Sequence, residues 1–119
     1  MYGNVLDRDL CNTAAYNGDL PVLKLARAEA RARGDPWDER TCHWAAKAGH
    51  LEVLQWAKGQ GCGWGAQTCY EAAWGGHLSV LIWARDEGCP WIKGDCERVA
   101  KRNANHQMLE WIRIGSCSS

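Results

Sequence analysis

The chain has 119 residues, with 14 basic and 14 acidic side chains and a formal net charge of zero. This length suits one domain, and the balanced charge excludes a general attraction to nucleic acid or to anionic lipid. We find no run of about 18 apolar residues that would span a membrane, and no secretory signal at the start. We therefore expect an intracellular protein, cytoplasmic or nuclear.

A sequence pattern returns with a period of 27 residues: Thr41–Trp56 and Thr68–Trp83 share Thr-Cys, Ala-Ala, Gly-His-Leu, Val-Leu and Trp in register. A fixed period of this size indicates a stack of small repeated units rather than one globular core. We divide a single domain over residues 1–114 into four units, and expect 115–119 to be a frayed tail. The units are 7–37, 38–64, 65–91 and 92–114.

The first unit is longer than the others. Residues 11–23 follow the repeated pattern, but the next copy begins 31 residues later instead of 27. The extra four residues lie in 28–33, a run of strong helix formers. Since four residues make about one helical turn, we expect the second helix of this unit to be one turn longer.

The second and third units each predict two short helices. We expect Asp38 to cap the first helix of the second unit, and Gly49 to end it in a left-handed conformation. Between them, apolar residues follow the helical spacing i, i+3, i+4 and i+7. A tight turn leads to the next unit, and its tryptophan is expected to pack onto the preceding helix pair. Six tryptophans keep the period and are predicted to be core residues: Trp37, Trp56, Trp64, Trp83, Trp91 and Trp111.

The fourth unit is degraded, because Asn103–His106 replaces Gly-His-Leu and adds one residue. Irregular outer units are typical of capping or truncated repeats. Here Val99, Met108 and Ile112 are expected to lack a following unit that would cover them.

The pattern Ala-Ala-x-x-Gly-His-Leu-x-Val-Leu, with a glycine just after the second helix, resembles the ankyrin repeat over about residues 7–113. The Thr-Pro-Leu-His tetrapeptide of that family is replaced by Arg40–His43 and Gln67–Tyr70, and the period is shorter than the usual 33. This form, with a Cys-Pro-Trp turn, is similar to ankyrin families of algae, oomycetes and giant DNA viruses. The resemblance implies an all-α solenoid of four helix-turn-helix repeats with reduced β-turn fingers.

Seven cysteines invite a metal or disulfide interpretation, which the repeat argues against. Equivalent atoms in stacked helices lie about 8–10 Å apart, whereas a disulfide needs Cα atoms within about 7 Å. We therefore expect no metal and no cofactor, with one set buried and the other exposed. The set expected to be buried is Cys11, Cys42, Cys69 and Cys96, and the set expected to be exposed is Cys62, Cys89 and Cys117.

The histidines give no indication of catalysis. His50 and His77 recur at the turn between helices, where we expect them to hydrogen-bond local backbone. Catalytic residues form a single constellation rather than a ladder. His43 follows Cys42, but adjacent helical residues do not face each other. With no phosphate loop or paired-carboxylate motif either, we expect no enzymatic activity.

The resemblance implies that the two variable residues between Ala-Ala and Gly lie on the concave face, joined by a residue one turn earlier. Trp74 stands out because the equivalent residues are a tyrosine and two lysines, although it could also lean on a neighbour. Asn12 and Glu97 complete the stripe, and Trp44 is expected to be at least partly exposed. The candidate partner-binding residues are Tyr16, His43, Lys47, Tyr70, Trp74 and Lys101.

Three functions stay open. The favoured one is a non-catalytic scaffold or adaptor that binds a protein partner of unknown identity on its concave face, since aromatic anchors beside a cation are typical of interface hot spots. The alternatives are a structural fragment of a longer array, with self-association through the terminal repeats, and a thiol-based metal or redox protein. The basic residues Lys24, Arg27 and Arg31 are interpreted as a solvated face, so we expect neither a nucleic-acid nor a membrane partner.

Overall fold

The structure is a computed structural model that describes residues 9–34 and 37–114, and all structural statements below refer to them. Within these residues the chain forms α-helices and no β-strand, so the all-α prediction is confirmed. The helices are α1 (Asp9–Asn17), α2 (Leu20–Ala32), α3 (Arg40–Ala48), α4 (Leu51–Gly59), α5 (Ala66–Trp74), α6 (Leu78–Asp86), α7 (Lys93–Arg102) and α8 (His106–Ile114).

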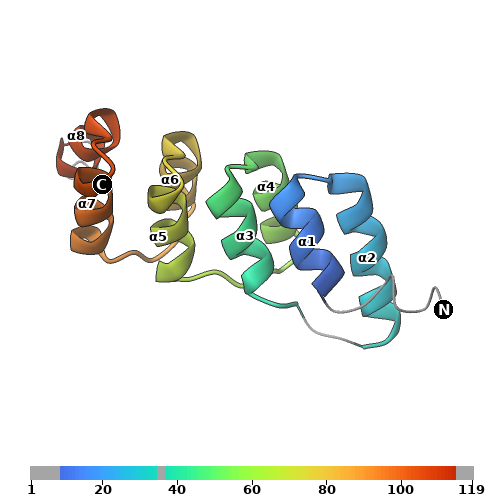
Figure 1. Cartoon of the computed structure of the whole chain (residues 1–119). Helices are drawn as coiled ribbons and strands as arrows, with labels where there is room; N and C mark the ends of the chain where they lie inside the picture. The colour runs from blue at the N-terminus through green and yellow to red at the C-terminus, as the bar shows by residue number, and fades with distance from the viewer. Residues whose placement is uncertain (1–8, 35–36, 115–119) are drawn as a thin grey trace.

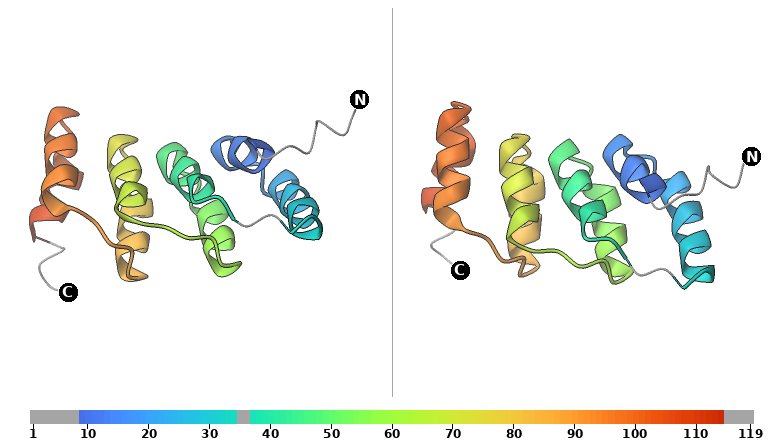
Figure 2. Two further views of the ribbon diagram at one scale, coloured as in Figure 1. Left: turned by 90° about the horizontal axis from the view of Figure 1, so that it is seen from below. Right: turned by 60° about the horizontal axis from the view of Figure 1, so that its bottom comes forward.

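The helices stand in pairs, and each predicted unit contains one pair (Figure 1). The odd-numbered helices form one layer and the even-numbered helices the layer behind it. The pairs follow one another in a row, which gives an elongated shape of 50 × 24 × 19 Å (Figure 2). Because each pair packs only on its neighbours, the architecture is a solenoid. Helix α2 has 13 residues against 9 in α4, which confirms the extra turn.

The turn inside each pair follows from local chemistry. Gly49 ends α3 with φ of 81°, a left-handed conformation that glycine adopts without strain. The next N–H, that of His50, donates to the carbonyl of Ala45 at 2.9 Å. At the other end of α3, Glu39 occupies the N-cap position, so Asp38 lies one residue before it. The Asp38 carboxylate accepts a hydrogen bond from the N–H of Arg40 at 3.0 Å.

The outer units keep this turn with different residues. Asp19 and Asn105 stand where the middle units have histidine, and their side-chain oxygens accept the N–H of Val22 and of Met108, each at 3.2 Å. Ala104 takes the place of the glycine and has φ of 56°. The degraded fourth unit therefore still forms a capped helix pair.

The two middle histidines connect neighbouring units rather than capping their own helices. Neither His50 nor His77 makes a side-chain capping hydrogen bond, which differs from the expected contact with local backbone. Their rings instead cover the turn of the preceding unit. A Cβ added to Gly18 would lie 2.6 Å from the His50 ring, and one added to Gly49 would lie 2.5 Å from the His77 ring. Glycine is needed there for space as well as for conformation.

The fourth unit buries its own apolar residues, so the expectation that they lack cover is wrong. Val99 is 4% exposed, and Met108 and Ile112 are fully buried. The reason is that α8 packs directly on α7 and closes the end of the stack.

The six periodic tryptophans are half-buried and pack against the core instead of lying inside it. The indole at each turn meets the indole on the second helix of the following unit edge to face, with ring centroids 5.5–6.1 Å apart. The preceding second helix adds a cation 4.5–4.7 Å from the turn indole. We call this arrangement the tryptophan ladder; its pairs are Trp37–Trp56, Trp64–Trp83 and Trp91–Trp111, with Arg27, Lys58 and Arg85 as the cations.

The prediction that Cys62 and Cys89 are exposed is wrong, because both are fully buried. The Cys62 thiol points inward, 3.7 Å from the carbonyl oxygen of Asp38. It also lies against the thiol of Cys42. The pKa of Cys42 is raised, mainly by this contact and to a smaller extent by burial. The repeat spacing sets the distance between equivalent cysteines of one set, but it does not determine the distance between a cysteine of one set and a cysteine of the other. Cys117 lies outside the described residues.

Candidate functional site

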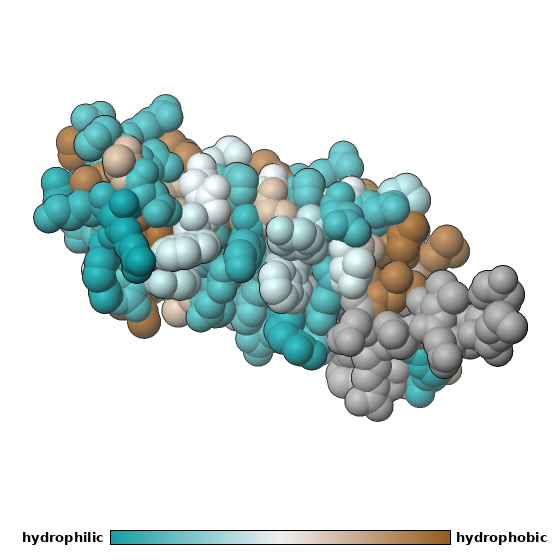
Figure 3. Space-filling view, in the orientation of Figure 1, coloured by the Kyte–Doolittle hydropathy of each residue, from teal (hydrophilic) through white to brown (hydrophobic). Residues whose placement is uncertain are grey.

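The candidate residues lie on the surface of the odd-numbered helices, which we call the front face (α1, α3, α5 and α7). Figure 3 shows this face coloured by hydropathy: hydrophilic and intermediate residues cover its middle, and the most hydrophobic ones gather toward the two ends. Among the described residues, one groove on this face lies between α5 and α7 and another between α1 and α3.

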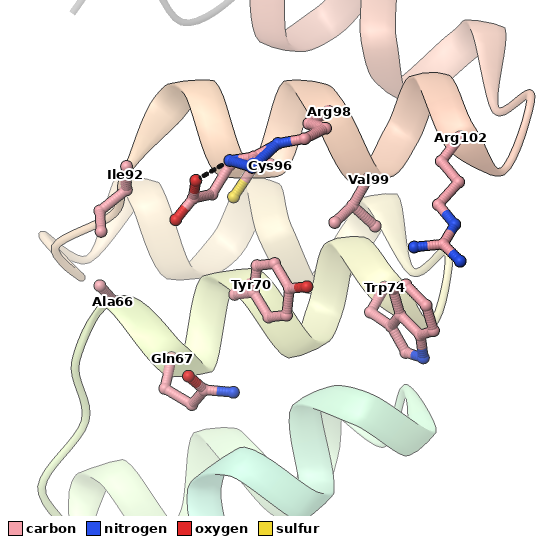
Figure 4. Close-up of a pocket in the computed structure, with 10 residues that line it drawn as sticks. Ala66, Gln67, Tyr70, Trp74, Ile92, Cys96, Arg98, Val99 and Arg102 are labelled. Carbon is pink, nitrogen blue, oxygen red and sulfur yellow. Dashed lines mark hydrogen bonds and ion pairs between the residues drawn. The ribbon is translucent and has the colours of Figure 1, made fainter.

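The groove between α5 and α7 has a volume of about 370 Å³ (Figure 4). Helix α5 contributes Tyr70 and Trp74, and the facing side of α7 contributes Val99 and Arg102. Trp74 is 39% exposed. The Arg102 guanidinium carbon lies 5.6 Å from the centre of the indole, a distance at which a cation is attracted to the aromatic face. The groove therefore combines an apolar wall with a positive charge.

Both acidic groups on α7 are paired with arginine. Asp95 pairs with Arg98, and the Glu97 carboxylate accepts a hydrogen bond from Arg113 at 2.9 Å. In the described part of the chain, neither Arg102 nor Lys101 forms an ion pair. The charge that α7 offers to a partner is therefore positive.

The groove between α1 and α3 has a volume of about 460 Å³ and is also lined by aromatic residues. The Tyr16 ring meets the Trp44 ring edge to face, with centroids 5.6 Å apart. The Lys47 ammonium lies 5.4 Å from the centre of the same indole. Tyr16 is 49% exposed and Trp44 is 37% exposed, which confirms that Trp44 is partly exposed.

Asn12 is not part of the exposed stripe in which we placed it, since it is only 7% exposed. Its side chain accepts a hydrogen bond from the Thr41 hydroxyl at 2.8 Å and donates one to Asp38 at 3.2 Å. A buried amide needs such partners. Asn12 therefore joins α1 to α3 beneath the groove.

The junction between α3 and α5 is tighter than either groove. A Cβ added to Gly75 would lie 2.3 Å from the carbonyl oxygen of Lys47, so glycine permits the close approach of the two helices. His43 is half-buried at this junction, and its Nε2 has no hydrogen-bond partner in the described residues. Burial lowers the pKa of His43, although the nearby Glu39 and Glu71 carboxylates oppose the shift.

Residues 42–85 match the family model described as ankyrin repeats (many copies). Residues 42–85 therefore carry ankyrin repeats, and the helix pairs on either side of them continue the same all-α solenoid. A comparison with curated protein sequences gives no match. Ankyrin repeats are generally protein–protein interaction modules and are typically non-catalytic. In the described segments, no helix has the length and apolar character needed to cross a membrane, and no three His, Cys, Asp or Glu side chains are grouped so as to hold a metal ion.

The six candidate residues fall into separate parts of the ankyrin front face. Tyr16 and Lys47 meet around Trp44, and Tyr70 and Trp74 share the second groove. His43 sits at the tight junction, and Lys101 is exposed but does not line a groove. The binding stripe thus resolves into two aromatic clusters.

Two residues that shape these clusters were not among the candidate binding residues: Arg102, and Trp44, which was expected only to be partly exposed. The candidate set takes one residue from each variable pair, so it includes Lys101 and leaves out Arg102. In a row of helices each inner helix faces two neighbours, so positions about 100° apart on one helix line different grooves. A search for aromatic or basic residues next to each selected position would have found both.

Proposed function

We propose that this ankyrin-repeat chain is a non-catalytic scaffold or adaptor that binds a protein partner on its front face. The observation that carries the proposal is Trp74. It is a large indole, 39% exposed, at a position where the other units carry tyrosine or lysine. The repeat does not require an apolar group there, and tryptophan and arginine are both among the residue types enriched at interface hot spots.

The interior of the protein supports a binding role over a chemical one. The six described cysteines are free and buried, and buried thiols are inert compared with exposed, electropositive ones. Such thiols persist in a reducing compartment. We therefore place the protein inside the cell, where this face is available to other proteins.

A pull-down with three forms of the chain tests the proposal. We expect the wild type and Leu25→Ala to capture the same partner, and Trp74→Ala to lose it, while circular dichroism and thermal unfolding agree among all three. Leu25 is a suitable control because it is 68% exposed but lies on α2, in the other layer. Equal capture by Trp74→Ala would exclude this face, and an unfolded Trp74→Ala would make Trp74 a structural residue.

A further inference from the structure

We propose that the partner is an acidic protein segment with two apolar side chains, one in the α1/α3 groove and one in the α5/α7 groove. Carboxylates next to these anchors pair with Lys47 and Arg102. This inference rests on the proposed function and adds the chemistry and spacing of the partner.

The first argument is that the two grooves share a chemistry that the repeat does not dictate. Each is lined by a tyrosine and a tryptophan, and each indole has a cation over it. Arg102 itself lines the second groove, whereas Lys47 lies over Trp44 beside the first. Trp44 and Trp74 nevertheless occupy different positions in their units, since the residue equivalent to Trp44 in the third unit is Glu71. The tryptophan therefore comes from the later helix of the first groove and from the earlier helix of the second, so the repeat alone does not produce the shared composition.

The second argument is charge. The cation over each indole leaves an apolar wall with a positive edge, which suits an apolar side chain followed by a carboxylate. Lys47, Lys101 and Arg102 form no ion pair in the part of the chain that the structure describes. The carboxylates of α7, in contrast, are paired with arginine. Glu71 on α5 accepts a hydrogen bond from Gln67 and also has no ion pair among the described residues, but the three cations outnumber it. The unpaired charge of the front face is therefore net positive, and its complement is acidic.

The third argument is distance. The two grooves are separated by two steps along the row of odd-numbered helices (Figure 2). Packed helices lie about 8–10 Å apart, so the anchors must be about 16–20 Å from each other. An extended chain covers this distance with about five or six residues at roughly 3.3 Å each, and a helix with about 11–13 residues at about 1.5 Å each.

Selection from a phage-displayed library of random 16-residue peptides, with the folded chain as bait, tests this inference. We expect enriched sequences to contain two aromatic or large aliphatic residues at one of these two spacings, with aspartate or glutamate beside them. A basic or uncharged consensus, a consensus with a single anchor, or no enrichment would overturn the proposal.

Fluorescence anisotropy with the best selected peptide then locates the site. We expect Trp44→Ala and Trp74→Ala each to weaken binding by about 30-fold. Arg102→Gln should weaken it by about 5-fold, with a smaller salt dependence between 50 and 500 mM NaCl. Leu25→Ala and Arg31→Gln are the matched controls on α2 and should bind as the wild type does. Unfolding curves identify any variant that has lost its fold, and Trp44→Phe and Trp74→Phe replace such variants with an expected smaller loss.

The outcomes separate this inference from the proposed function. An uncharged peptide whose binding needs Trp74 would overturn the acidic partner and leave the front face as the interface. An acidic peptide that is insensitive to both tryptophans would overturn both proposals. A 16-nucleotide oligothymidine that binds more tightly than the acidic peptides would assign the face to nucleic acid and overturn the protein segment.

Discussion

The molecule uses tryptophan in two regions and in two ways. In the tryptophan ladder every turn indole pairs with an indole on a helix, and the turn indoles also have a cation within 4.7 Å. On the front face, Trp44 and Trp74 occupy repeat positions at which the other units have no tryptophan. They are 37% and 39% exposed. Both regions combine aromatic rings with cations, so chemistry alone does not distinguish them. Recurrence with the repeat does: the tryptophans that each unit supplies hold the units together, and those that a single unit supplies are the ones that we propose for binding.

The largest difference in stability should appear when one tryptophan of the ladder and one of the front face are each replaced by alanine. Trp64→Ala removes a half-buried indole together with its contacts to Trp83 and Lys58. We expect the free energy of unfolding to fall by about 2–3 kcal/mol, somewhat less than for a fully buried aromatic residue. Trp74→Ala should change it by less than about 0.5 kcal/mol. Urea denaturation measures both values, and equal losses would remove the distinction between the two regions.

The recurring turn offers a second comparison, between Gly49 and Gly34. Both have φ of 81°, so alanine pays the same left-handed backbone cost, about 1 kcal/mol, at either position. At Gly49 the new Cβ would also meet the His77 ring at 2.5 Å, whereas at Gly34 it meets nothing within 4 Å. In the same denaturation experiment, we expect the free energy of unfolding to fall by about 2 kcal/mol in Gly49→Ala and by about half of that in Gly34→Ala. A similar loss for both would show that the His77 ring moves away without cost.

The ladder cations should contribute less than the indoles. Lys58→Gln removes the ammonium that lies 4.6 Å from the Trp64 ring centre. A partly exposed cation–π contact is worth about 0.5–1 kcal/mol, and we expect a loss of that size. Lys101→Gln, on the front face, should leave thermal stability unchanged. If both variants have the same thermal stability, the ladder cations do not hold the units together.

The smallest effect concerns pH and His43. Burial holds the pKa of this imidazole below its ordinary value in the folded state. As the pH falls, the unfolded chain therefore takes up the proton first, near its ordinary pKa of about 6.5, and folding stability decreases. The Asp38 carboxyl, whose pKa is lowered mainly by its hydrogen bond to Arg40, titrates at lower pH and stays outside this window. The melting temperature should fall less between pH 7.5 and 5.0 in His43→Gln than in the wild type. Equal slopes would show that His43 takes up its proton without cost in the folded state.

The sequence was sufficient for the parts of the fold that repeat. The period predicted the paired helices, the longer α2 and the role of Gly49, because these depend on local chemistry and regular spacing. It was not sufficient for contacts between different repeat positions. The meeting of Cys42 with Cys62 and the burial of Asn12 each depend on how two segments from different parts of the chain pack.

The candidate site was harder to predict for the same reason. Trp74 could be selected because it departs from the repeat. Arg102 follows the selected Lys101 in the sequence, but only its position over the indole connects it with Trp74. Which helix a side chain faces is decided by packing, and a pattern read along one helix cannot supply that information.

The close packing of α3 on α5 has a further consequence. The units touch only their neighbours, and their interior residues recur, so a stack of this kind can be lengthened by one whole unit without a new core. One more unit with small front-face residues, placed between the second and third, would separate the two grooves by a further 8–10 Å or so. In the binding mode that we propose, the number of helix pairs between the grooves therefore sets the spacing of the two anchors in the partner.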